Sequence, residues 1–165
     1  MVRLPFLPRL GASGLVVTSL ILAFVLTLVP MPQWAAFLRP QWVALVLIYW
    51  CMATPQLVGP GIAWMVGLLL DALTGSLLGL HGLVLATVAF VTGLSYQRVR
   101  MAPLPQQALW VAAVLLLGQI IAYVVLVLVQ RGPEPGFFLT VAVSALIWPW
   151  LFLVLRDLRR ASNTV

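Results

Sequence analysis

The chain is poor in the side chains that carry most protein chemistry. Its 165 residues include no lysine, one histidine (His81), one cysteine (Cys51) and three acids (Asp71, Glu134 and Asp157). A metal site of ordinary ligand number cannot be assembled from so few donors, and one cysteine cannot form an intrachain disulfide. The sequence has no phosphate-binding loop, no nucleotide fingerprint and no recognisable Ser/His/Asp set. An enzyme is therefore disfavoured, and we expect no catalytic residue, cofactor or metal.

Charge is scarce, whereas apolar residues are abundant. Charged residues make up 7% of the chain and hydrophobic residues 64%, which does not describe a water-soluble globule. Several apolar runs approach the roughly 20 residues that a helix needs to cross a bilayer. The net charge of +6 comes from arginines at the ends of these runs, where positive charge sets topology and meets lipid headgroups. The composition predicts an all-α integral membrane protein and argues against nucleic acid as a partner.

Six apolar runs, separated by proline, glycine and arginine, predict one membrane domain over residues 1–165. The expected spans are 11–29, 41–54, 62–78, 83–96, 108–129 and 137–155. The segment 97–107, with two arginines and two prolines, is expected to be a loop. Tyr49 and Trp50 lie too deep in their run for the interfacial aromatic belt and should pack against neighbouring helices. Pro149, between Trp148 and Trp150, should bend the last helix.

The arginines favour a topology with both termini in the cytoplasm. With six spans, the outer segments carry only Arg39 and Arg131. The inner segments carry the other seven arginines, namely Arg3, Arg9, Arg98, Arg100, Arg156, Arg159 and Arg160. This asymmetry has the sign of the positive-inside rule. The last five of these residues are the expected basic anchors at the cytoplasmic surface.

Asp71 is the only acid deep inside an apolar run. An ionised carboxylate in hydrocarbon costs roughly 2.5–3.5 kcal/mol on insertion scales, so it needs a partner. On a continuous helix it would share a face with small and aromatic residues, which are Trp64, Gly67, Thr74, Gly75 and Gly79. The Gly75 and Gly79 pair has GxxxG spacing, which favours close helix packing. Three interpretations stay open: a structural hydrogen bond, a contact with a partner helix, and a role in transport or proton relay.

His81 follows Asp71 by ten residues. If the helix continued, the two would be roughly 15 Å apart and could share neither a metal nor a proton. His81 is instead grouped with Trp34 and Arg39 as possible polar contacts near the outer surface. These three residues support an alternative function, a small-molecule-binding subunit of a transporter.

Four strings in order make the sequence resemble a known family. They are 39-RPQWVALVLIYW-50, 67-GLLLDALTGSLLG-79, Tyr96-Gln97 with 106-QQAL-109, and 148-WPW-150. Together they resemble MreD, the bacterial rod shape-determining membrane protein family, over about residues 29–160.

The resemblance implies a non-enzymatic component of the cell-elongation machinery in the bacterial inner membrane. Members of this family are expected to act as a scaffold for MreC, alongside MreB, RodA and its penicillin-binding transpeptidase. The resemblance also implies a fold similar to the six-helix substrate-binding subunits of energy-coupling-factor transporters, which says nothing of function. On this basis the Asp71 and glycine face either builds the bundle core or receives the transmembrane helix of MreC, while the cytoplasmic arginines meet lipid or the filament.

Overall fold

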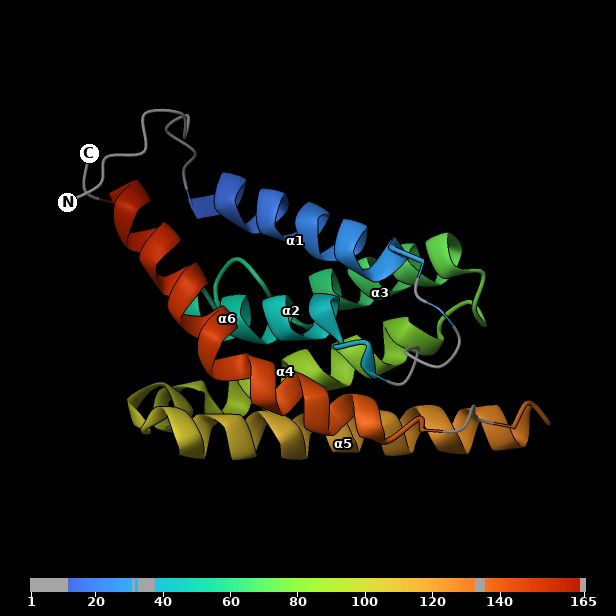
Figure 1. Ribbon diagram of the computed structural model, residues 1–165. Helices are drawn as coiled ribbons and strands as arrows, with labels where there is room; N and C mark the ends of the chain where they lie inside the picture. Colours follow the sequence, from blue (N-terminus) through green and yellow to red (C-terminus); the bar gives the residue numbers. More distant parts are fainter. Residues whose placement is uncertain (1–11, 31, 33–37, 133–135, 164–165) are drawn as a thin grey trace.

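A computed structural model of the protein describes residues 12–30, 32, 38–132 and 136–163. The regular structure of these residues is helical, and six α-helices follow one another along the chain (Figure 1). Their bounds are α1 Ala12–Leu28, α2 Trp42–Ala53, α3 Pro60–Thr74, α4 Leu80–Met101, α5 Leu104–Leu128 and α6 Leu139–Asn163. The expected all-α fold class is confirmed.

Successive helices run in opposite directions, so their ends gather at two ends of the bundle (Figure 1). The start of α1, the end of α2, the α4–α5 turn and the end of α6 lie at the left in the figure. Arg39 precedes α2 and Arg131 follows α5, which places both at the right-hand end. At the left-hand end are the last turns of α4 and α6 with Arg98, Arg100, Arg156, Arg159 and Arg160. The described arginines thus lie at two opposite ends of the bundle, while Arg3 and Arg9 lie outside the described residues.

The short helix α2 is the centre of the bundle. It contacts α1, α4 and α6, and all of its residues from Val43 to Met52 are buried. The indole nitrogen of Trp50 donates to Ser19 Oγ at 2.8 Å, and the Tyr49 ring meets Phe152 edge to face at 5.7 Å between centroids. A helix that is apolar on every side must be covered on every side. The prediction that Tyr49 and Trp50 pack against neighbouring helices is confirmed.

Among the described residues, three helices are long and apolar enough to cross a membrane: α4, α5, and α6 over Leu139–Ala161. The helices α1, α2 and α3 have 17, 12 and 15 residues, which is less than the roughly 20 that a perpendicular span needs. Pro149 lies inside α6, and the helix bends near its middle as expected (Figure 1).

The predicted loop over residues 97–107 is wrong for most of its length. Helix α4 continues through Arg98 and Arg100 to Met101, and α5 begins at Leu104. Arginine is a good helix former, and positive charge in a last turn complements the helix dipole. Only Ala102 and Pro103 interrupt the helices, because the residue before a proline avoids helical geometry. Pro105 falls in the first turn of α5, where a missing N–H costs nothing.

Candidate functional site: the Asp71 cap between α3 and α4

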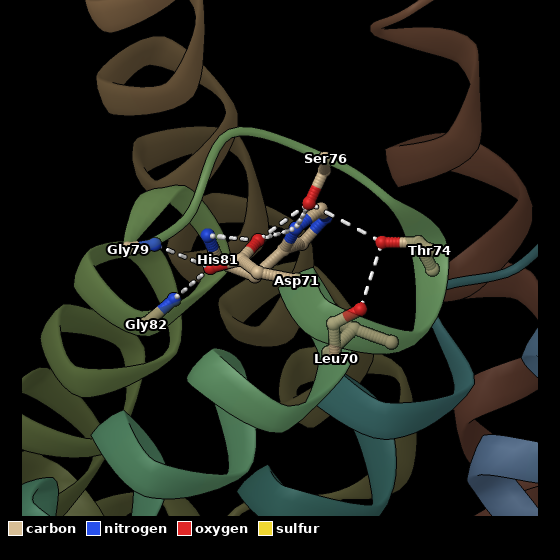
Figure 2. Close-up of polar contacts among 7 residues, drawn as sticks. All are labelled: Leu70, Asp71, Thr74, Ser76, Gly79, His81 and Gly82. Carbon is tan, nitrogen blue, oxygen red and sulfur yellow. Dashed lines mark hydrogen bonds and ion pairs between the residues drawn. The ribbon is translucent and has the colours of Figure 1, made fainter.

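Asp71 lies in the last turn of α3, with 1% of its surface exposed. Its carboxylate faces the start of α4, whose first N–H groups have no carbonyl in a preceding turn (Figure 2). The backbone N–H of Gly79 donates to Oδ2 at 2.8 Å, and that of His81 donates to Oδ1 at 3.1 Å. Gly82 N–H reaches Oδ2 at 3.5 Å. The negative charge therefore caps the positive end of α4, a favourable place for an anion.

Two side chains complete the set of donors around Asp71. The Ser76 hydroxyl donates to Oδ1 at 2.6 Å, and His81 Nδ1 lies 2.7 Å from the same oxygen (Figure 2). An ionised carboxylate only accepts hydrogen bonds, so it suits a site that presents hydroxyl and N–H donors from several directions. The cost of burying the charge is offset by this set of charge-assisted bonds.

The chain reverses direction between Asp71 and His81, contrary to the predicted continuous helix to residue 78. Gly75 ends α3 in the left-handed region at φ 66°, and Gly79 precedes α4 at φ 93°. Glycine adopts these conformations without the steric penalty of a side chain. The estimate of roughly 15 Å between Asp71 and His81 is therefore wrong, because it assumed unbroken helix.

The predicted glycine strip is also wrong as a single helical face. Gly75 and Gly79 belong to the turn and not to α3. Gly67 is a packing glycine, since a Cβ built on it would lie 2.4 Å from the Cα of Gly82 in α4. The helix that covers Gly67 and Asp71 is thus α4 of the same chain. Trp64 remains 49% exposed on this face.

Asp71, Ser76 and His81 form a cluster that the sequence did not reveal. Its geometry is not that of a nucleophile activated by histidine, because the Ser76 hydroxyl donates to the carboxylate. Ser76 Oγ faces His81 Nδ1 at 3.3 Å, the same nitrogen that meets Asp71, whereas a catalytic triad needs opposite nitrogens for serine and aspartate. Thr74 donates to Leu70 O at 2.7 Å and closes the turn at its other side. The arrangement stabilises a helix junction.

Comparison with known proteins places the chain in a family. The model of the family described as rod shape-determining protein MreD matches residues 9–158. The chain belongs to the MreD family. The rod shape-determining protein MreD of Haemophilus influenzae is 35% identical over 150 residues, which cover 88% of this chain and 90% of that relative. No solved structure matches the chain. The family is described by its effect on cell shape, and the resemblance seen in the sequence is confirmed.

In this MreD-family chain, Arg39 and His81 of the expected outer-side group have different hydrogen-bond partners. Arg39 donates from Nη1 to Thr27 O at 2.9 Å and from Nη2 to Val29 O at 2.7 Å, so its guanidinium binds the last carbonyls of α1. His81 is bound to Asp71. Trp34 lies outside the described residues. Arg39 therefore acts as a cationic cap at the C-terminal end of α1.

Arg39→Met is expected to lower the free energy of unfolding by about 1–2 kcal/mol, because two charge-assisted bonds to α1 are lost. Denaturant titration in mixed micelles would measure the change. Arg131→Met is the matched control, since this arginine is exposed at the same end of the bundle and should cost less than about 0.5 kcal/mol. Equal losses from the two variants would contradict the capping role.

A second polar network, at the start of α2, was missed by sequence analysis. The Gln41 N–H donates to Ser144 Oγ at 2.9 Å, and its side chain donates to Thr140 Oγ1 at 3.2 Å. Gln119 of α5 donates to the same Thr140 oxygen at 2.9 Å and to Phe137 O at 2.8 Å. Isolated polar residues in apolar runs were the available signal, because such residues pair between membrane helices. This network joins α2, α5 and α6.

Proposed function

We propose that this protein is a non-enzymatic inner-membrane component of the bacterial cell-elongation complex and is required for rod shape. It would act as a scaffold for MreC and, through the complex, for MreB, RodA and its penicillin-binding transpeptidase. The observation that carries the proposal is the family match over residues 9–158, nearly the whole chain.

The internal polar groups favour a scaffold. The buried acid caps α4, Arg39 caps α1, and Ser144 caps the start of α2, so these groups hold helices together. Within the described residues, no three His, Cys, Asp or Glu side chains gather to hold a metal ion.

We further propose that all six helices are embedded in the membrane with both termini cytoplasmic, in a fold like that of the energy-coupling-factor subunits. The end that carries Arg98 and Arg100 would then be the cytoplasmic end.

The contact with MreC is proposed on the exposed side of α3. Because α4 covers Gly67 and Asp71, the part of the predicted packing face that is open to another helix is centred on Trp64. A large aromatic side chain is a frequent anchor of protein interfaces. Trp150 in α6 is 62% exposed, so it is a tryptophan of similar exposure that lies outside α3 and can serve as a control.

Trp64→Ala is expected to reduce MreC recovery about five-fold or more when the tagged protein is co-purified with MreC of the same organism, as for loss of an interface anchor. The abundance of the inserted protein should stay normal. Trp150→Ala is the matched control and should leave recovery unchanged. Undiminished recovery with Trp64→Ala would contradict the α3 contact.

Complementation tests the function itself. The wild-type gene should restore rod shape to cells depleted of their own MreD, with cell width as the measurement. Normal insertion without restored shape, and no MreC recovered with the wild-type protein, would together contradict the proposed function.

A further inference from the structure

A cavity opens at the end of the bundle where α4 and α5 meet. Its volume is about 440 Å³, and it lies between the end of α2, the α4–α5 turn and the C-terminal half of α6. Ligand sites commonly have volumes of about 300–1,000 Å³, so this space is large enough for a small molecule or a headgroup. The structural roles assigned above do not use it.

The cavity is strongly basic. Four arginines line it: Arg100, Arg156, Arg159 and Arg160. No acidic residue of the described chain is among its lining residues. Like charges gathered in one cavity favour the binding of an anion, and the guanidinium fork matches the oxygens of a phosphate.

Some of the arginines in the cavity bind other groups of the chain, whereas Arg100 and the terminal nitrogens of Arg156 remain for a ligand. Arg159 donates from Nη1 to Ala53 O at 3.3 Å, which caps α2. Arg156 donates from Nε to Asp157 Oδ1 at 3.4 Å, a long contact that leaves its terminal nitrogens outside that bond. Arg100 lines the cavity and is exposed.

Two further features point to an anion with a polar headgroup. Gln107 is 3% exposed and lines the cavity, and its Oε1 is buried without a hydrogen-bond partner. A ligand hydroxyl could satisfy this acceptor, which otherwise keeps its desolvation penalty. Leu104 begins α5 at the wall of the cavity, so the positive end of a 25-residue helix dipole also faces this region.

We propose that this cavity binds the phosphate headgroup of an anionic glycerophospholipid. The walls beside the arginines are apolar, with Met52, Leu104 and Phe152, and would accommodate the upper part of an acyl chain. The cavity lies where the long apolar helices end, which is the level of the headgroups. Basic pockets between membrane helices bind anionic headgroups in this way. The inference rests on the membrane position of α4–α6 and not on contact with MreC.

Native mass spectrometry of the full-length protein in detergent tests the proposal with two lipid probes. Dioleoylphosphatidylglycerol should bind about thirty-fold more tightly than dioleoylphosphatidylcholine, because its net negative charge should raise the affinity about five-fold for each of the two available arginines, Arg100 and Arg156. Arg100→Gln with Arg156→Gln should weaken phosphatidylglycerol binding about ten-fold or more, as expected for lost charge-assisted bonds. Arg98→Gln is the control, since Arg98 lies in the same turn but does not line the cavity, and it should change binding less than about two-fold.

Several results would overturn the assignment. Equal affinity for the two lipids, or equal weakening by Arg98→Gln, would mean that no defined site exists. Displacement of the lipid by an equal concentration of inorganic phosphate would assign the arginines to a free anion. Displacement by a decaglutamate peptide at lower concentration would assign them to an acidic protein segment. Arg100→Gln alone removes an exposed side chain and should weaken binding about three-fold, so the test remains decisive where the double variant is unstable.

Discussion

Asp71→Leu is expected to lower the free energy of unfolding by about 3–5 kcal/mol, the range for a broken buried polar network. The Ser76 hydroxyl and the N–H groups of Gly79 and His81 all donate to this carboxylate. Leucine fills the space but leaves these donors unsatisfied in a site that excludes water, and each costs about 1–3 kcal/mol. The start of α4 would lose its cap, and the amount of inserted protein should fall with it.

Unfolding in mixed micelles, followed by the fluorescence of the seven tryptophans, would measure this loss. Asp71→Asn should lower the free energy of unfolding less, by about 1–3 kcal/mol, because its side-chain oxygen still accepts hydrogen bonds. Its NH2 group would face a hydrogen-bond donor and could not accept from it. Asp157→Asn is the control, since its side chain is 67% exposed and, within the described part of the chain, its carboxylate makes only the long contact with Arg156. Normal stability of Asp71→Leu would contradict the capping role. Retained stability with lost MreC binding would show that Asp71 is a partner contact.

Gly67→Val should prevent the native packing of α3 on α4, and Gly67→Ala should destabilise the protein by about 1–3 kcal/mol or more. A Cβ at this position would lie 2.4 Å from Gly82 Cα and 2.5 Å from its nitrogen. These are backbone atoms, so relief requires the two helices to separate. The same separation would draw Asp71 away from the N–H groups that it caps, and the two losses should be coupled. Unfolding titrations of Gly67→Ala, Asp71→Asn and the double variant would measure that coupling as non-additivity.

Gly93→Ala provides the contrasting case. Gly93 lies inside α4, and beyond its chain neighbours and the adjacent backbone of its own helix no heavy atom of the described residues lies within 4 Å of the position that a Cβ would take. Alanine there should therefore stabilise the helix by about 0.5–1 kcal/mol. Alanine is expected to destabilise the protein at Gly67 and to stabilise it at Gly93. Comparing the two variants therefore separates the effect of the close α3–α4 contact from that of helix propensity. Destabilisation of similar size at both positions would show that the α3–α4 contact is not the cause.

The helices were predictable because long apolar runs and prolines give strong local signals. The separation of the arginines likewise indicated helices of alternating direction. The short run that forms α2 was harder to interpret, since its 12 residues are few for a span. The burial of α2 follows from its apolar surface on all sides. The identity of the helices that cover it depends on tertiary packing, which the sequence of one apolar run does not determine.

The site was only half predictable. An acid in an apolar run needs a partner, and that reasoning identified Asp71. The partners were missed because Gly75 and Gly79 fit two patterns, a packing motif on a helix and a pair of turn residues. Thr74, Gly75 and Ser76 are all compatible with a turn, and the choice between the two patterns changes the position of His81 completely. Sequence spacing cannot decide between them, because the deciding energy is that of the cap formed once the chain has turned.

The buried helix α2 also has a consequence for biosynthesis. Its start is held by Ser144, 103 residues from Gln41, and the carbonyl of its last residue, Ala53, is held by Arg159, 106 residues away. Both partners belong to α6, which leaves the ribosome after α1–α5. During translation α2 therefore lacks the contacts that hold its two ends, and it acquires them only when α6 arrives. The order of synthesis thus makes α6 the helix that completes the first half of the bundle.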